Sequence, residues 1–503
     1  MAGRSLATGS LRVDFHTPMT TSPTPHPDSY VPDPRRWKAL AVCFVGGFVT
    51  MLDVSIVNVA LPSIQSALHA GATQLQLIVA GYTLAFGLVL VPFGRIGDAH
   101  GRRQMFMVAM AGFALMSLLA GLSRTDTQLA VSRLLQGAFA GMSNPQVSGM
   151  IQQMFRGRER AKAFGFLGAT IGFSTAIGPL IGGLILSVAG TENGWRWIFF
   201  INVPICLAVL PLARRLLPRA PARKSSTRLD IVGLIFIGLG TATFMAPFVT
   251  TPDSGFFHSP ERWWWLALAF PLAPVTFFWE RRYQRKYHAA VLNPGLLRDP
   301  SFVFGAAVGS AYFAGFSALM LVMSMMLQSG LHHSALATGL VLLPYAVASG
   351  VAATQAGRLV PRFGRRLVVA GLSTALIGLI LVIGLIHLSP ISSILPVLSA
   401  ALFLAGAGNG FVIAPNNALA YQDVPPQEGS VAGAVLQVGQ RAGSAVGVSV
   451  VLAVFLSVFT SDISLSGPAV ASRNAAGLSL IISASFIAIA LIFAVLDMRR
   501  RAH

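Results

Sequence analysis

The sequence predicts an all-α membrane protein, a bundle of about fourteen transmembrane helices. Hydrophobic residues make up 54% of the 503 residues and charged residues only 11%, a balance typical of integral membrane proteins. Apolar stretches of about 20 residues, the length that crosses a bilayer, also recur along the chain. They cover residues 37–60, 74–93, 104–122, 128–150, 163–188, 196–213, 231–250, 263–279, 302–327, 335–356, 367–387, 393–414, 431–458 and 477–496. The count would fall if one member of the pair 231–250 and 263–279 were re-entrant.

The positive charge is distributed unevenly between the loops. The chain carries a net charge of +19, and most of its 36 Lys and Arg residues lie near the two ends or in alternate connections. Cytoplasmic loops show such an excess, so we expect both termini in the cytoplasm. The Ala, Gly and Arg content is typical of a GC-rich bacterium, which suggests a multi-pass protein of the bacterial inner (plasma) membrane. A nucleic-acid-binding protein would gather these cations on one soluble face, so we expect no nucleic-acid partner.

A short repeat divides the chain into two halves. Residues 94–103 read G-R-I-G-D-A-H-G-R-R after the second span, and residues 357–366 read G-R-L-V-P-R-F-G-R-R after the tenth. Two six-helix halves of the same orientation would produce this pattern, which is found in transporters with a central site. We expect a disordered cytoplasmic tail over 1–34, an N-terminal six-helix bundle over 35–215, an inserted linker and helix hairpin over 216–288, and a C-terminal six-helix bundle over 289–503.

Asp53 is the only acidic residue well inside an expected span. A carboxylate in hydrocarbon is costly, so an ionisable residue there is a functional candidate by default. We interpret Asp53 as a group that binds a proton from one side and releases it to the other. The alternative is a neutral or paired Asp that fixes helix packing. Thr50 and Asn58 lie on neighbouring turns and are expected to hydrogen-bond it.

Two arginines also lie inside expected spans. Arg133 in the fourth span is followed one turn later by Gln136. A nearby cation favours the ionised form of a carboxylate, so Arg133 would help Asp53 to release its proton; a structural hydrogen-bonding role is the alternative. Arg441 in the thirteenth span, with Gln437 one turn earlier, raises the same question. Gly443 and Gly447, a G-x-x-x-G pair, favour close helix packing there.

Five motifs resemble those of the major facilitator superfamily, in particular its fourteen-span drug:proton antiporter branch (EmrB/QacA-like). Residues 94–103 resemble the loop motif G-x-L-A-D-R-x-G-R-K, with Ala99 where the family usually has Arg. The other four motifs are residues 52–62 in the first span, 133–137 in the fourth, 168–183 in the fifth and 195–204 at the start of the sixth. The resemblance covers nearly the whole chain and implies the major facilitator fold, two parallel six-helix bundles plus an inserted two-helix hairpin.

The resemblance implies a proton-coupled antiporter that exports small apolar or amphipathic compounds, such as drugs or toxic metabolites, by alternating access. Asp53 and Arg133 would couple transport to protons. Conformational change would involve the loop and fifth-span motifs, whose residues are Gly94, Asp98, Gly101, Arg102, Arg103, Gly178, Pro179, Gly182 and Gly183. A proton symporter or facilitator for uptake of a small solute is the alternative.

The substrate itself is only broadly constrained. The polar residues expected to contact it are Thr50, Asn58, Gln136, Asn416, Gln437 and Arg441. Its charge stays open, because the single acid suits neutral or monovalent cationic compounds whereas the two intramembrane arginines would admit anions. We expect a small molecule, protons and the lipid bilayer as partners of a monomeric protein.

No motif indicates catalysis or a cofactor. The chain lacks the phosphate-binding pattern G-x-x-x-x-G-K-[ST] and any His and Cys cluster with zinc-site spacing. We therefore expect no enzyme activity, no metal and no cofactor, and a transport cycle driven by the proton gradient.

Overall fold

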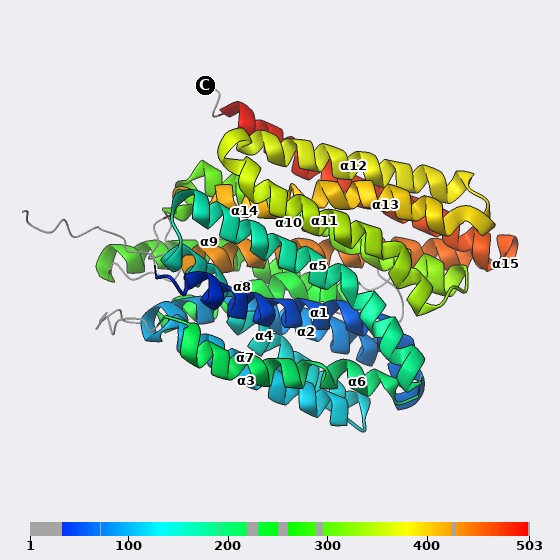
Figure 1. Cartoon of the computed structure of the whole chain (residues 1–503), viewed down its shortest axis with the longest axis horizontal. Helices are drawn as coiled ribbons and strands as arrows, with labels where there is room; N and C mark the ends of the chain where they lie inside the picture. The colour runs from blue at the N-terminus through cyan, green and yellow to red at the C-terminus, as the bar shows by residue number, and fades with distance from the viewer. Residues whose placement is uncertain are drawn as a thin grey trace, which may run out of the picture.

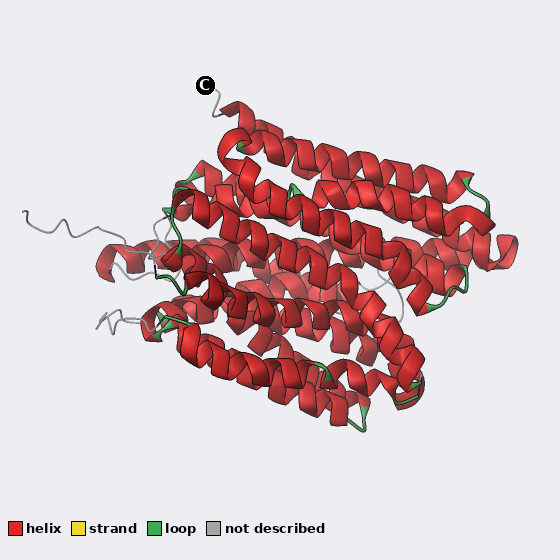
Figure 2. Cartoon of the chain, in the orientation of Figure 1, coloured by secondary structure: helices red, strands yellow, loops and turns green. Residues whose placement is uncertain are grey.

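A computed structural model of the chain describes residues 33–70, 72–190, 192–218, 230–249, 260–287, 295–424 and 429–500. The expected N-terminal tail falls almost wholly outside these residues. Every regular element within them is a helix (Figure 2), which confirms the predicted fold class. The longer helices are α1 (Arg36–Leu68), α2 (Ala72–His100), α3 (Arg102–Leu122), α4 (Asp126–Met154), α5 (Gly157–Ala189), α6 (Gly194–Phe200), α7 (Asn202–Leu216), α8 (Ile231–Val249), α9 (Trp264–Tyr287), α10 (Pro300–Met325), α11 (Ala335–Phe363), α12 (Arg365–Leu388), α13 (Ile394–Gly410), α14 (Ile413–Ala420) and α15 (Gly429–Arg500).

Eleven described helices are long and apolar enough to cross a membrane. One of them, Val431–Arg500, joins two of the expected spans across a break at Gly467, where φ is 76°. α4 and α9 coincide with the expected spans 128–150 and 263–279 but are not among the eleven. α4 is buried at every residue from 140 to 152, and polar residues of a membrane-spanning helix are tolerated where they face the interior of the bundle. The total of fourteen spans stays a prediction.

Helices α1 to α7 lie on one side of the bundle and α10 to α15 on the other (Figure 1). α1 begins and α15 ends at the same end of the bundle, where the α2–α3 and α11–α12 connections also lie. We call this the basic end, because Arg36, Arg102, Arg365 and Arg499 lie there. The helix pair α8–α9 touches both sides: Gly87 of α2 approaches Met245 of α8, and Ser449 of α15 donates a hydrogen bond to the Phe248 carbonyl.

Two expected spans are broken instead of continuous. The span 196–213 divides into α6 and α7 at Ile201, and the span 393–414 divides into α13 and α14 at residues 411–412. A proline follows each break by three residues, and proline has no N–H to donate to the carbonyl four residues earlier. Pro204 therefore cannot bond Phe200, and Pro415 cannot bond Phe411. The hydropathy pattern could not show these breaks, since both segments stay apolar throughout.

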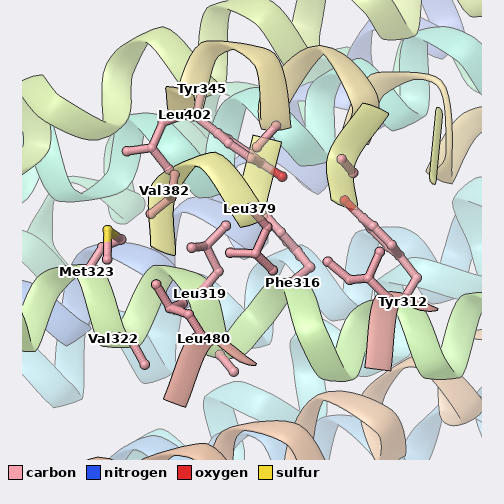
Figure 3. Packing of buried hydrophobic residues seen from close by; sticks show 14 of the residues in the cluster. Tyr312, Phe316, Leu319, Val322, Met323, Tyr345, Leu379, Val382, Leu402 and Leu480 are labelled. Carbon is pink, nitrogen blue, oxygen red and sulfur yellow. The ribbon is translucent and has the colours of Figure 1, made fainter. Parts of the chain in front are cut away.

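The largest buried core lies among α10 to α15 and draws on residues 308–494. Its aromatic residues Tyr312, Phe316 and Tyr345 form a stack, with ring centroids 6.0 Å and 5.9 Å apart (Figure 3). The Tyr312 hydroxyl donates to Asn409 Oδ1 at 2.6 Å, and Asn409 Nδ2 donates to Ser349 Oγ at 2.7 Å. Because these polar atoms satisfy one another, this region acts as packed core. Two further cores draw mainly on residues 39–217.

Helix α5 uses its glycines to pack against three other helices, α1, α11 and α14. A Cβ on Gly178 would come within 2.6 Å of Ser55 on α1, whereas a Cβ on Gly168 would come within 2.7 Å of Ala414 on α14. Gly172 similarly faces Ser349 of α11, at 2.8 Å. Gly182 faces α1, and Gly183 is buried. The later glycines of the fifth-span motif, Gly178 and Gly182, thus pack α5 onto α1, while its earlier glycines, Gly168 and Gly172, pack α5 onto the opposite half.

Gly443 and Gly447 of α15 lie against α10, as a packing role predicts. A Cβ on either would come within 2.0 Å of a backbone oxygen, that of Ser310 or Ala314. Any side chain larger than hydrogen would therefore push the two helices apart.

Gly447→Ala is expected to lower the free energy of unfolding by about 1–3 kcal/mol, the usual cost of overpacking. The measurement is thermal unfolding of the detergent-solubilised protein. Gly384→Ala on α12 is the matched control, because no atom lies within 4 Å of a Cβ there. Equal stability of the two variants would contradict the packing role.

Candidate functional site

The Asp53 carboxylate is fully buried in the middle of α1. Its neighbours Leu52, Ile56 and Val57 are also buried, so this stretch of α1 is enclosed by other helices. An ionised group in such a place must find its partners within the protein. The helices around α1 provide them.

Three side chains from two helices bind the carboxylate. Arg133 Nη1 on α4 lies 2.5 Å from Asp53 Oδ2. Gln136 Nε2, one turn later on α4, donates to Asp53 Oδ1 at 3.0 Å. Asn202 Nδ2, the first residue of α7, donates to the same oxygen at 2.8 Å. Gln136 Nε2 also donates to Ser117 Oγ on α3 at 2.6 Å, and this bond holds the Gln136 amide in place.

The Arg133 guanidinium is also enclosed, with a side chain only 2% exposed. Besides Asp53, it donates to the Gln136 Oε1 at 2.7 Å and to the Ile78 carbonyl at 3.2 Å. Its Cζ lies 4.3 Å from the ring centre of Tyr82 on α2, a cation–π distance. Asp53 and Arg133 thus form a neutral pair whose polar atoms are largely satisfied.

The predicted proton-coupling residues Asp53 and Arg133 therefore lie together, and Gln136 joins them. Thr50 and Asn58 do not bind Asp53 as expected. The Thr50 hydroxyl donates to the Gly47 carbonyl of its own helix at 3.0 Å, a common alternative for threonine in helices. Asn58 is exposed, because five residues of α-helix turn it by about 140° from Asp53.

The remaining substrate candidates lie on the other half. Asn416 is buried and donates to the Gly305 carbonyl at 2.8 Å. Gln437 and Arg441 are half-buried on α15. The Arg441 side chain crosses to the first half, where its Cζ lies 4.2 Å from the Phe86 ring centre and Nη2 lies 3.3 Å from Met51 Sδ.

Three residues of the Asp53 site were not predicted as site residues: Ser117, Tyr82 and Asn202. Asn202 gave a usable signal, since an amide within an apolar span needs a partner and it lies in the sixth-span motif. Ser117 and Tyr82 gave none, because serine and tyrosine occur throughout such spans. Only the packing of α2 and α3 against α4 brings them here.

The loop motif joins α2 to α3 at the basic end. Gly101 has φ of 107°, a conformation that residues with a side chain rarely adopt. Arg102 Nη2 lies 2.8 Å from Asp98 Oδ1, and Arg102 Nη1 donates to the Gly149 carbonyl of α4 at 2.6 Å. Arg103 donates to the Arg214 carbonyl at the end of α7. Gly94 is buried in α2. Within this loop motif, Asp98 and Arg102 therefore form an ion pair with each other.

The second copy of the repeat also has a glycine with positive φ, but a different acid pairs with its arginine. Gly364 has φ of 52°, and Arg365 follows it as Arg102 follows Gly101. Pro361 occupies the position that corresponds to Asp98. Arg365 instead forms an ion pair with Asp497 near the end of α15.

Across the described residues, no group of three His, Cys, Asp or Glu side chains is placed to hold a metal ion.

Arg133→Gln is expected to destabilise the protein by about 3–5 kcal/mol, because it leaves the Asp53 charge buried without a cation. The double variant Asp53→Asn/Arg133→Gln is expected to be more stable than Arg133→Gln, since both charges are then absent. Thermal unfolding of all four members of this cycle measures the coupling. A double variant no more stable than Arg133→Gln would show that the two charges do not stabilise each other.

Comparison with known proteins identifies the family. The sequence profile of the Major Facilitator Superfamily matches residues 43–448 and 305–502. The chain is 33% identical to the probable actinorhodin transporter of Streptomyces coelicolor over 83% of this chain and 73% of that protein. It is 35% identical to the puromycin resistance protein pur8 of Streptomyces alboniger over 82% of this chain and 80% of that protein.

A solved structure shows the same fold. The proton:xylose symporter XylE superposes with a TM-score of 0.61 at 14% identity, covering 90% of this chain and 95% of that chain. The matched profile and the relatives are those of membrane transporters, and not of enzymes. This chain belongs to the major facilitator superfamily and is a multi-pass membrane transporter.

Proposed function

We propose that this protein is a proton-coupled antiporter of the fourteen-span branch that exports small apolar or amphipathic compounds. The observation that carries the proposal is the enclosed Asp53 carboxylate, held by Arg133, Gln136 and Asn202. The names of two relatives, a probable actinorhodin transporter and a puromycin resistance protein, support export as the direction.

The ionised form of Asp53 is well supported by its surroundings. One oxygen accepts from the Arg133 guanidinium and the other from two amide N–H groups. Charge-assisted hydrogen bonds of this kind are about twice as strong as neutral ones. The Asp53–Arg133 ion pair therefore represents the proton-free state of the transport cycle.

The same cluster offers a place for a proton. Within the described residues, Asn202 Oδ1 is buried and has no hydrogen-bond partner. A protonated Asp53 gains an O–H donor, and Asn202 Oδ1 or Gln136 Oε1 would accept it. The cation–π contact of Arg133 with Tyr82 and its bond to the Ile78 carbonyl remain when the carboxylate is neutral. Both protonation states thus have partners, which a residue that binds and releases a proton needs.

Protonation would change the contacts of α1. A neutral Asp53 holds Arg133 less strongly, so α1 and α4 are freer to move apart. α1 is packed on α5 through Gly178 and Gly182, and α5 is packed on α11 and α14 through Gly168 and Gly172. Pro179 is part of this contact, since its backbone approaches Gly339 of α11. A shift of α1 is therefore passed through α5 to the opposite half, as alternating access requires.

The contacts at the basic end would act as a latch that favours one conformation of the transporter. The Asp98–Arg102 pair ties α2 and α3 to the Gly149 carbonyl of α4, and Arg103 ties α3 to α7. These side chains are only partly buried, so each contact biases the conformational equilibrium modestly.

We also propose the domain division, oligomeric state and membrane location that we expect from the sequence. The two six-helix bundles cover 35–215 and 289–503, with the hairpin 216–288 between them. The protein is a monomer of the bacterial inner membrane with both termini in the cytoplasm. It uses the proton gradient, without a cofactor.

Proton movement in inside-out vesicles tests the proposal. Adding a transported compound is expected to dissipate a preset pH gradient with wild-type protein but not with Asp53→Asn, which cannot exchange the proton. The panel should include cationic, neutral and anionic drugs. Asp33→Asn, an exposed carboxylate outside the spans, is the matched control and is expected to behave as wild type. If Asp53→Asn responds as wild type does, Asp53 is structural and the uptake alternative gains weight.

Asn202→Leu is expected to slow proton-coupled transport by about tenfold with little change in KM. The reason is that a buried group left unpaired costs about 1–3 kcal/mol, here in one protonation state of Asp53. The measurement is the initial rate of proton-coupled export as a function of substrate concentration. Ser143→Ala removes a buried hydroxyl that bonds the Ala140 carbonyl of its own helix, and it is expected to leave the rate unchanged. An equal loss in both variants would contradict a specific role for Asn202.

A further inference from the structure

Arg441 is the intramembrane cation that the Asp53 site does not use. It lies on α15 and reaches across to α1 and α2 of the other half. The contacts found there are the Met51 thioether and the face of the Phe86 ring. Neither carries a negative charge, and the side chain remains partly exposed. An arginine in this setting is costly unless an anion or water compensates it.

The charge balance around Arg441 is positive. Asp53 is the one acidic residue well inside the spans, and Arg133 already neutralises it at 2.5 Å. Among the described residues, no carboxylate forms an ion pair with Arg441. The region between the halves thus carries one unbalanced positive charge. In a medium of low dielectric constant such a charge attracts anions and repels cations strongly.

We propose that Arg441, Gln437 and Phe86 bind the substrate, and that the substrate is an aromatic compound carrying one oxyanion, such as a carboxylate, a sulfonate or an ionised phenol. This inference rests on the proposed export function and names its substrate class. Arg441 and Gln437 are four residues apart on α15 and therefore lie on the same helix face. A guanidinium fork and an amide N–H form a suitable donor set for an oxyanion.

The apolar part of the substrate would contact the Phe86 and Met51 side chains. Aromatic faces favour stacking with another ring, and methionine adapts to ligands of different shape. Phe86 also stacks on Tyr82, with ring centroids 6.3 Å apart. Tyr82 in turn faces the Arg133 guanidinium at 4.3 Å. The proposed substrate site is therefore joined to the proton site by two stacked rings of α2.

The test compares two dyes that differ in one anionic group. 1-Anilinonaphthalene-8-sulfonate carries a sulfonate, and N-phenyl-1-naphthylamine has the same ring skeleton without it. Fluorescence titration of the full chain in nanodiscs, corrected for empty nanodiscs, gives the affinity for each. Wild type is expected to bind the anionic dye more tightly than the neutral one. Arg441→Gln is expected to lose about tenfold in affinity for the anionic dye and to bind the neutral dye as wild type does.

Two further variants make the result specific. Arg441→Lys keeps the charge but not the guanidinium fork, and it is expected to give an intermediate affinity for the anionic dye. Arg499→Gln removes an exposed cation at the basic end and is expected to change neither affinity. The proposal is overturned if wild type shows no preference for the anionic dye. It is also overturned if Arg441→Gln keeps that preference or loses affinity for both dyes equally.

This binding test is independent of proton coupling. If Asp53→Asn still dissipates the pH gradient while Arg441→Gln selectively loses the anionic dye, the coupling mechanism fails and the substrate class stands. If the reverse is found, proton-coupled export stands and the substrate class fails.

Discussion

The buried ion pair between Asp53 and Arg133 is the constraint on which the first half of the molecule depends. Burial of a single charge in a helix bundle is highly unfavourable, and a pair is tolerated only when its hydrogen bonds are satisfied. That requirement explains why α3, α4 and α7 present Ser117, Gln136 and Asn202 around α1. The division of the span 196–213 into α6 and α7 makes Asn202 the first residue of the second helix. Because α7 begins in the middle of a span, the side-chain amide of its first residue lies beside the Asp53 carboxylate.

Close packing carries the consequences of this pair to the second half. Glycines bring α5 against α1 on one side and against α11 and α14 on the other. These contacts leave no long, flexible side chains between the helices. A displacement of one helix therefore displaces its neighbour as well. α5 is therefore the element through which protonation at Asp53 would reach the opposite bundle.

The two copies of the internal repeat share a turn glycine but differ in the acid that pairs with the following arginine. Both copies have the glycine with positive φ and the arginine that follows it. The acid is Asp98, within the motif, in the first copy and Asp497, on the last helix, in the second. The second copy thus fastens the chain end to the α11–α12 connection. The intramembrane arginines of the two halves also differ, since Arg133 has a carboxylate partner and Arg441 has an aromatic ring and a thioether.

Composition and local pattern determined the class of this protein. Apolar length, the distribution of Lys and Arg, and five short motifs predicted a helical membrane transporter with Asp53 and Arg133 as its proton-coupling residues and Gln136 as a substrate contact. Each of these signals is contained in neighbouring residues. Tertiary structure alone decided which side chains complete the site. Thr50 and Asn58 share a helix with Asp53 but bond elsewhere or face away, whereas Asn202 is 149 positions distant and binds it directly. The physical reason is that a buried charge selects its partners by distance and direction in space, and spacing along one helix supplies neither.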